Sequence, residues 1–97
     1  MAKRIVWSRR AKDERREILE YWYQRNKSKV YSKKLFRLFQ LAVYQIRENP
    51  TMGKSTSHKS IRMYIIKDYL MFYEILESRI LILTIWDSRQ NPVKLKL

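Results

Sequence analysis

The stretch ILILTIWDSRQNP, residues 80–92, divides into an apolar half and a polar half. The residues through Trp86 are almost free of polar side chains, and those that follow are almost entirely polar. An apolar run of this length, rich in β-branched residues, is typical of a buried strand. Because the run is apolar on both faces, we expect an interior strand of a sheet that helices cover on one side. The polar half then places Arg89 at the end of the sheet, where a cleft could form.

Two helices are predicted after an opening strand at residues 3–8. Ser8 is a candidate N-cap for the first helix, which extends to a polar break at residues 24–28. The second helix shows apolar residues at three- and four-residue steps, as one buried face requires. It must end by Asn49, because Pro50 disfavours helical geometry in the residue before it. The short break predicts that the two helices form an antiparallel hairpin.

Three strands, at residues 61–67, 69–77 and 79–87, are predicted after a basic loop at residues 50–60. The breaks between these strands are short enough for hairpin turns. We therefore expect one α+β domain over residues 1–97, in the order β-α-α-β-β-β. In this fold the helical hairpin packs on an antiparallel sheet.

The composition indicates a basic protein with an anionic partner. The chain of 97 residues has 22 Lys and Arg against 9 Asp and Glu, a net charge of +13. Such a charge predicts nucleic acid, an acidic protein, or both in turn as binding partners. The alternative is a well-solvated basic surface without a ligand. The lack of cysteine excludes disulfides and fits a cytoplasmic location. No apolar run approaches the ~18–20 residues of a membrane span, so no membrane partner is expected.

Basic side chains close to the predicted strand ends form a candidate functional site. Arg89 has a planar guanidinium that suits phosphate or carboxylate. Lys54 and His58 lie in the basic loop, and Arg62 lies in the strand after it. Together these residues could bind a phosphate backbone. Aromatic residues such as Tyr69 are close in the sequence, and nucleic-acid bases can stack on such rings.

Each candidate has a simpler alternative. Arg89 could be an exposed charge or the ion-pair partner of Asp87. Tyr69 and the other aromatic residues of the strands could pack in the core, and His58 could be a solvated side chain. One histidine, no cysteine and scattered acids argue against a metal site or other cofactor. If the protein cuts RNA, we therefore expect attack by the 2′-hydroxyl, with Lys and Arg stabilising the transition state.

Four motifs can be compared with known families. They are IVWS at residues 5–8, ENPTMGK at 48–54, IRMYIIKDYLMFYEI at 61–75 and ILTIWDSRQNP at 82–92. Together they resemble the RelE/ParE superfamily of toxins from bacterial type II toxin–antitoxin systems, the last two most specifically. The resemblance implies a small basic toxin that an acidic cognate antitoxin neutralises in a hetero-oligomeric complex.

The resemblance implies one of two activities. RelE-like members cut mRNA in the ribosomal A site, and ParE-like members poison DNA gyrase. The arginine that RelE-like nucleases carry early in the third strand corresponds to Leu70 here, and no Tyr or His follows Arg89. We therefore favour a gyrase-directed or noncatalytic toxin over a ribosome-dependent endoribonuclease. The candidates for a catalytic role are Arg89, Arg62 and Lys54, with His58 or Tyr69 as acid or base.

Two hypotheses from other classes stay open. One is a non-toxic module that binds nucleic acid, for which affinity should fall steeply with salt. The other is a protein-only interaction partner whose basic helices hold an acidic peptide.

Overall fold

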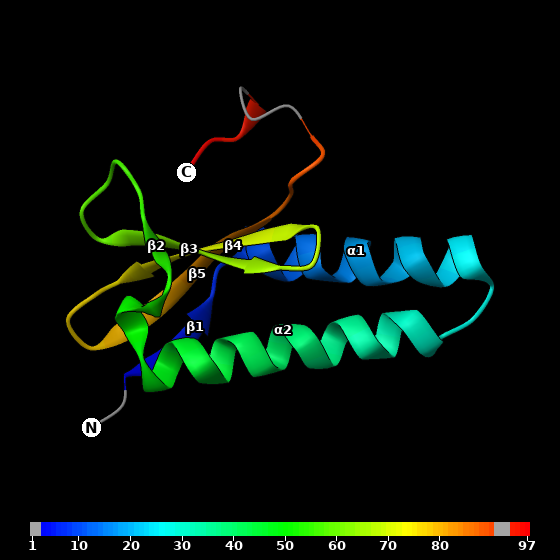
Figure 1. Cartoon of the computed structure of the whole chain (residues 1–97), viewed down its shortest axis with the longest axis horizontal. Helices are drawn as coiled ribbons and strands as arrows, with labels where there is room; N and C mark the ends of the chain where they lie inside the picture. The colour runs from blue at the N-terminus through cyan, green and yellow to red at the C-terminus, as the bar shows by residue number, and fades with distance from the viewer. Residues whose placement is uncertain (1–2, 91–93) are drawn as a thin grey trace.

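A computed structural model describes residues 3–90 and 94–97, which form a helical hairpin and a five-stranded sheet (Figure 1). The elements are β1 Arg4–Trp7, α1 Arg9–Asn26, α2 Val30–Glu48, a 3₁₀ turn Pro50–Met52, β2 Lys54–Ser55, β3 Ile61–Ile66, β4 Tyr69–Ile75 and β5 Arg79–Asp87. The predicted order β-α-α-β-β-β is confirmed, and the two-residue strand β2 is added within the predicted loop. None of the helices in the described ranges is both long and apolar enough to cross a membrane.

The strands form one sheet in the order β1-β5-β4-β3-β2. Strands β3, β4 and β5 pair antiparallel, as predicted, and the additional strand β2 pairs antiparallel with β3. The predicted fold class is confirmed, and the sheet differs from the predicted antiparallel one at one edge, where β1 runs parallel to β5 and makes the sheet mixed. The helical hairpin and three strands separate β1 from β5 in the sequence, so no tight turn sets their relative direction. The backbone N–H of Ser8 extends the pairing by donating to the carbonyl of Ile82 at 2.9 Å.

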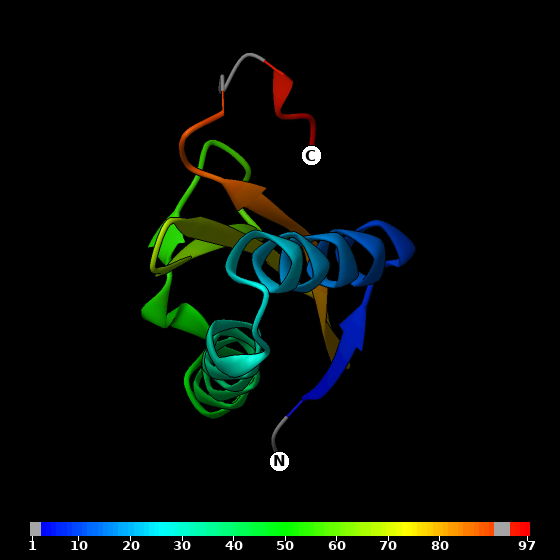
Figure 2. The same cartoon turned by 90° about the vertical axis from the view of Figure 1, so that its right-hand side faces the viewer.

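Strand β5 lies between β1 and β4, which confirms the prediction of an interior strand. Its Ile80, Ile82 and Ile85 are buried in a core shared with the helices. Figure 2 looks along the hairpin and shows both helices against the same side of the sheet. The register of β4 and β5 shifts between Phe72 and Tyr73, so the strict alternation of faces is interrupted there.

Local sequence signals position both helices. Ser8 caps α1 as predicted: its Oγ accepts from the N–H of Ala11 at 3.0 Å. The same hydroxyl donates to the carbonyl of Leu83 at 2.8 Å, which joins the start of α1 to β5. Helix α2 ends at Glu48, two residues before Pro50, as predicted. The fully buried residues of α2 are Leu35, Phe39, Ala42 and Ile46.

Candidate functional site

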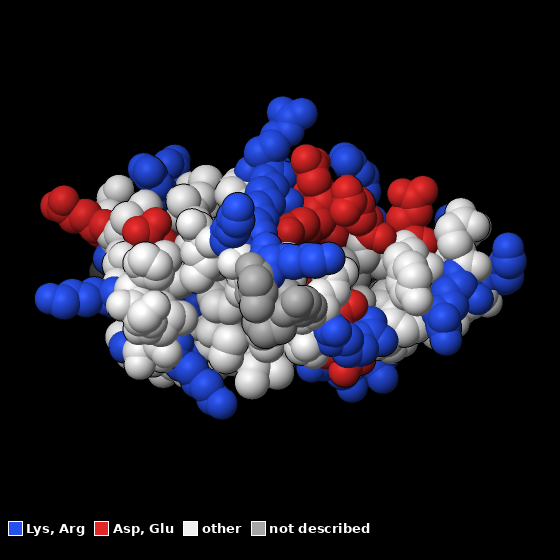
Figure 3. Space-filling view, turned by 90° about the horizontal axis from the view of Figure 1, so that it is seen from above, with Lys and Arg blue, Asp and Glu red and all other residues white. Residues whose placement is uncertain are grey.

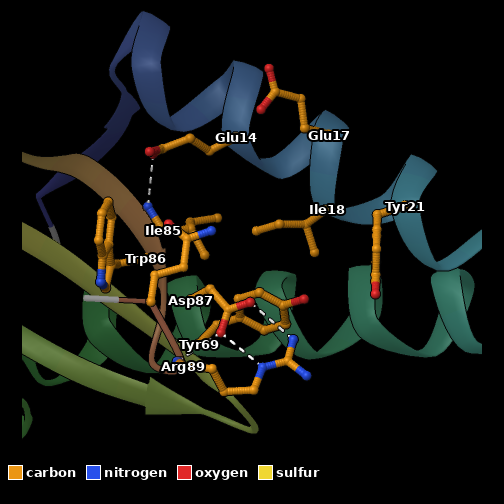
Figure 4. Close-up of a pocket in the computed structure, with 10 residues that line it drawn as sticks. Glu14, Glu17, Ile18, Tyr21, Tyr69, Ile85, Trp86, Asp87 and Arg89 are labelled. Carbon is orange, nitrogen blue, oxygen red and sulfur yellow. Dashed lines mark hydrogen bonds and ion pairs between the residues drawn. The ribbon is translucent and has the colours of Figure 1, made fainter. Parts of the chain in front are cut away.

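A hollow of about 430 Å³ opens between α1 and the end of β5, beside the start of β4 (Figure 4). We call it the α1–β5 hollow. Its lining includes Tyr69 and Arg89, two of the predicted site residues, together with the acidic Glu14, Glu17 and Asp87. The other lining residues are Ile18, Tyr21, Ile85, Trp86 and Gln90. Arg89 and Gln90, which follow β5, therefore lie at the edge of a cavity, and residues 91–92 of the predicted polar segment lie outside the described residues.

Arg89 forms an ion pair with Asp87 at the rim of this hollow. Asp87 ends β5, and the turn after it brings the backbone N–H and the Nε–H of Arg89 to Oδ1 of Asp87, at 2.9 and 3.0 Å. The Nη2 atom of Arg89 donates to Oδ2 at 2.9 Å. These charge-assisted hydrogen bonds lower the pKa of Asp87, so the carboxylate is ionised at neutral pH. The side chain of Arg89 is still 53% exposed, so the pair orients the guanidinium without removing it from solvent.

Tyr69 begins β4 and is only 3% exposed, which agrees with the core-packing alternative. Its hydroxyl accepts a hydrogen bond from Nε1 of Trp22 at 2.7 Å, and its ring packs edge-on against Phe39. Burial raises the pKa of Tyr69, because the phenolate would lose solvation. The hydroxyl therefore stays protonated at neutral pH, where it can donate to a group in the hollow but cannot act as a base.

Glu14 connects α1 to the middle of β5. Its Oε1 accepts from the hydroxyl of Thr84 at 2.6 Å and from the N–H of Ile85 at 3.1 Å. Its Oε2 pairs with Nε of Arg10 at 3.3 Å. Thr84 is completely buried, so this carboxylate satisfies a polar group that packing alone would leave unpaired.

Sequence reasoning did not identify the acidic wall of the hollow. The signal for this wall in the sequence was the spacing of Glu14, Glu17 and Tyr21 by three and four residues. This spacing places the three side chains on one side of α1. Figure 4 shows the three side chains along α1, across the hollow from Asp87 and Arg89. Three carboxylates and one guanidinium thus surround the cavity. Its formal charge is negative, which disfavours a phosphate ligand.

Arg62 has a structural partner near the other end of β4. We call residues 50–53, between α2 and β2, the Gly53 turn. The Nη1 atom of Arg62 donates to the carbonyl of Gly53 at 2.7 Å and to that of Thr51 at 3.2 Å. Tyr73, which is fully buried and faces Arg62 in the sheet register, accepts from the N–H of Gly53 at 3.0 Å and donates to the carbonyl of Pro50 at 2.6 Å. Arg62 and Tyr73 together hold the turn against the sheet.

Three of the predicted site residues lie away from the α1–β5 hollow. Lys54 is exposed in β2, and His58 is exposed in the loop before β3. Arg62 pairs with a residue of β4 that lies four positions beyond Tyr69, about 13 Å along the strand. Of the five predicted residues, the hollow therefore brings together Arg89 and Tyr69.

Charged side chains are unevenly distributed over the face shown in Figure 3. Acidic side chains gather over α1, and Lys and Arg side chains project around them. A local acidic area on a protein with a net charge of +13 agrees with the carboxylates that line the hollow.

Comparison with known proteins identifies the fold and the family. Residues 5–92 match the family described as "ParE toxin of type II toxin-antitoxin system, parDE". The structure is similar to one described as "Chromosomal ParDE TA system from P. aeruginosa", with a TM-score of 0.73 and 16% sequence identity. The alignment covers 87% of this chain and 94% of that chain. No curated protein matches the sequence.

The fold and the family match together define a toxin of the RelE/ParE superfamily, as the four motifs predicted. More narrowly, the chain belongs to the ParE toxin family and is the toxin component of a type II toxin–antitoxin system.

Proposed function

We propose that this toxin arrests growth by binding a protein target, DNA gyrase, and not by cutting RNA. The choice of gyrase follows from the resemblance to ParE-like toxins. The observation that supports a protein target is the charge around the α1–β5 hollow, where Asp87 pairs with Arg89 and Glu14 and Glu17 line the opposite wall. Glu14 pairs with Arg10 and Asp87 with Arg89, so it is the remaining carboxylate, that of Glu17, that would repel a phosphodiester. A protein surface carries both signs of charge and can pair with the acids and the arginine together.

The candidate residues support a nuclease less well. Arg62 already donates to two backbone carbonyls. Tyr69 keeps its proton at neutral pH because burial raises its pKa. Leu70, at the position where RelE-like nucleases carry a catalytic arginine, is a half-buried hydrocarbon side chain opposite Trp86 in the sheet. A binding function needs none of these residues to move a proton.

The proposal includes an acidic cognate antitoxin that neutralises the toxin in a cytoplasmic hetero-oligomer. The net charge of +13 supports an acidic partner, because opposite charges accelerate association and lower the cost of bringing the chains together. The first test is expression of the toxin alone and with the acidic reading frame next to it. We expect growth arrest in the first case and growth in the second. Normal growth with the toxin alone would contradict an active toxin.

The target is tested with the purified full-length toxin, gyrase and relaxed plasmid. We expect loss of supercoiling and accumulation of gyrase-linked DNA breaks, while primer extension on cellular mRNA shows no codon-phased cuts. Glu17→Lys should weaken gyrase inhibition, because it reverses an exposed charge of the hollow. Glu48→Lys, at the exposed end of α2, is the matched control. Codon-phased cuts with unimpaired supercoiling would replace the proposal with an endoribonuclease.

A further inference from the structure

The connection between α1 and α2 forms a basic surface at the end of the molecule that lies away from the sheet (Figure 1). No Asp or Glu occurs from residue 21 to residue 47, a span that contains seven Lys and Arg. Five of these bases lie within residues 25–34, and all five side chains are exposed. We call this set the hairpin-end patch: Arg25, Lys27, Lys29, Lys33 and Lys34.

The hairpin-end patch has no internal counter-charge. None of its five members forms an ion pair within residues 3–90 and 94–97. Arg25 contacts aromatic side chains instead: its Nη1 donates to the hydroxyl of Tyr21 at 3.5 Å, and its guanidinium lies 5.8 Å from the ring centroid of Trp22. A group of uncompensated cations raises the local concentration of an anionic ligand.

Helix stability does not explain this arrangement of charge. The N-terminus of a helix carries a partial positive charge, which acidic side chains stabilise. Helix α2 instead has Lys29 at its N-cap position, without a side-chain cap hydrogen bond, and has no acidic residue in its first turn. Lys33 lies four residues after Lys29, a spacing at which like charges on a helix repel. Charges that destabilise an element are expected where they serve a ligand.

The side chains of the patch suit phosphates better than a protein or a lipid surface. The centre of a protein interface is apolar, and helices that bind a membrane surface insert apolar side chains into it. The patch is polar throughout residues 24–29, and the one exposed apolar side chain inside its span is Val30. Apolar surface for a protein partner lies instead in the hollow between α1 and α2, which Leu19, Tyr23 and Phe36 line. Contacts with a phosphate backbone need cations without an apolar anchor.

The patch adjoins the α1–β5 hollow, the proposed contact with gyrase. Tyr21, which lines that hollow, lies one helical turn, about 6 Å, before Arg25 on α1. A protein bound at the hollow therefore places whatever it carries next to the patch, and gyrase carries duplex DNA. We propose that the hairpin-end patch binds the phosphate backbone of duplex DNA, so that the toxin contacts the protein and the DNA of one complex. The choice of duplex DNA rests on the proposed gyrase target.

The test measures binding of a fluorescent DNA duplex of about 20 base pairs to the full-length toxin over a range of salt concentrations. The patch variant carries Arg25→Gln, Lys27→Gln and Lys34→Gln, and the control carries Arg79→Gln, Lys67→Gln and Lys59→Gln. Each triple removes one exposed arginine and two exposed lysines, one of them with a left-handed backbone. The patch variant also leaves the lining of the hollow between α1 and α2 unchanged.

We expect the patch variant to lose about tenfold in affinity for the duplex, and its plot of log affinity against log salt to flatten by about 2, because phosphate contacts are lost. The control should lose much less, since it lowers the net charge without touching the patch. Equal losses in the two variants would contradict a localised site. Displacement of the duplex by polyglutamate of equal charge, at equal concentration, would assign the patch to an acidic protein instead.

Two further measurements separate the patch from the target and from a membrane. The duplex assay contains no gyrase, so a failure of patch-dependent binding contradicts the patch alone. Glu17→Lys, in the α1–β5 hollow, should weaken gyrase inhibition without weakening duplex binding. Vesicles with about 30% phosphatidylglycerol supply the competing surface. Patch-dependent binding to these vesicles, with equal duplex affinity in the patch variant and the control, would overturn the proposal in favour of a membrane surface.

Discussion

Tyr69 and Tyr73 lie four residues apart on the helix-facing side of β4, and each has an arginine nearby, yet their surroundings differ. At Tyr73, the hydroxyl and Arg62 both bind the backbone of the Gly53 turn. At Tyr69, the hydroxyl binds Trp22, and Arg89 binds Asp87 at an open rim. One tyrosine–arginine pair therefore stabilises a chain reversal, and the other leaves a guanidinium accessible.

The difference shows that the available partners decide the role of such a pair. The Gly53 turn presents backbone carbonyls and an N–H that need hydrogen-bond partners, and Tyr73 and Arg62 provide them. The end of β5 presents a carboxylate to Arg89 and a cavity to solvent. Substitutions at the first site should therefore change stability, and those at the second should change activity.

The largest effect on stability is expected for Gly53→Ala, at the only glycine of the chain. The backbone φ of −71° suits any residue, but an added Cβ would lie 2.6 Å from the hydroxyl oxygen of Tyr73 and 2.9 Å from the carbonyl of Met63. The turn must move away and lose its hydrogen bonds, so the free energy of unfolding should fall by about 3 kcal/mol. Urea denaturation measures this loss. Ser57→Ala, in the exposed loop, is the control, and equal midpoints would refute the close contact.

Tyr73→Phe should cost about 2 kcal/mol, because it leaves the N–H of Gly53 and the carbonyl of Pro50 without their partner. Tyr69→Phe should cost less, about 1 kcal/mol, since only the half-buried Nε1–H of Trp22 loses an acceptor. Urea denaturation of both variants tests the comparison directly. The reverse order of the two losses would show that the Gly53 turn does not depend on Tyr73.

Alkaline pH should destabilise the wild type through both tyrosines. Burial raises the pKa of Tyr69 and of Tyr73 above 10.0, so between the unfolded and folded pKa values the unfolded chain loses protons that the folded chain keeps. Their contribution is fully present below pH 10.0 and is lost as the pH rises through the folded pKa values. The double variant Tyr69→Phe and Tyr73→Phe should show a flatter decline of unfolding free energy above this pH. Parallel declines would argue against burial as the cause.

Arg89→Gln should have the smallest effect on stability, about 0.5 kcal/mol or less, because the ion pair with Asp87 is partly exposed. The pKa of Asp87 is lowered in the folded state, so this small contribution is present above the unfolded pKa of about 3.9 and is lost as the pH falls through the folded pKa. Growth inhibition, measured by induced expression, should nevertheless be lost or strongly reduced. Arg79→Gln, an exposed arginine at the start of β5, should stay toxic. Full toxicity of Arg89→Gln would remove Arg89 from the functional surface.

Several elements could be predicted because their signals are local. The apolar run that ends at Trp86 indicated an interior strand, Ser8 indicated a helix N-cap, and Pro50 indicated the end of α2. The motifs indicated the toxin family that residues 5–92 match. The prediction that Arg89 lies beside a cavity used the same local change from apolar to polar residues, and the structure places Arg89 at such a cavity.

The sequence by itself determined the order of the elements, the net charge and the buried faces, because periodicity, capping and composition act between residues that are neighbours in the chain. Only the tertiary structure decided that β1 runs parallel to β5, that Arg62 binds the Gly53 turn, and that carboxylates of α1 face Arg89. These outcomes depend on which distant segments meet and on the distance between their polar atoms. Side-chain types alone specify neither which segments meet nor how far apart their polar atoms lie. A tyrosine and an arginine can therefore hold a turn in one place and leave a guanidinium accessible in another, according to the partners that the tertiary structure brings to them.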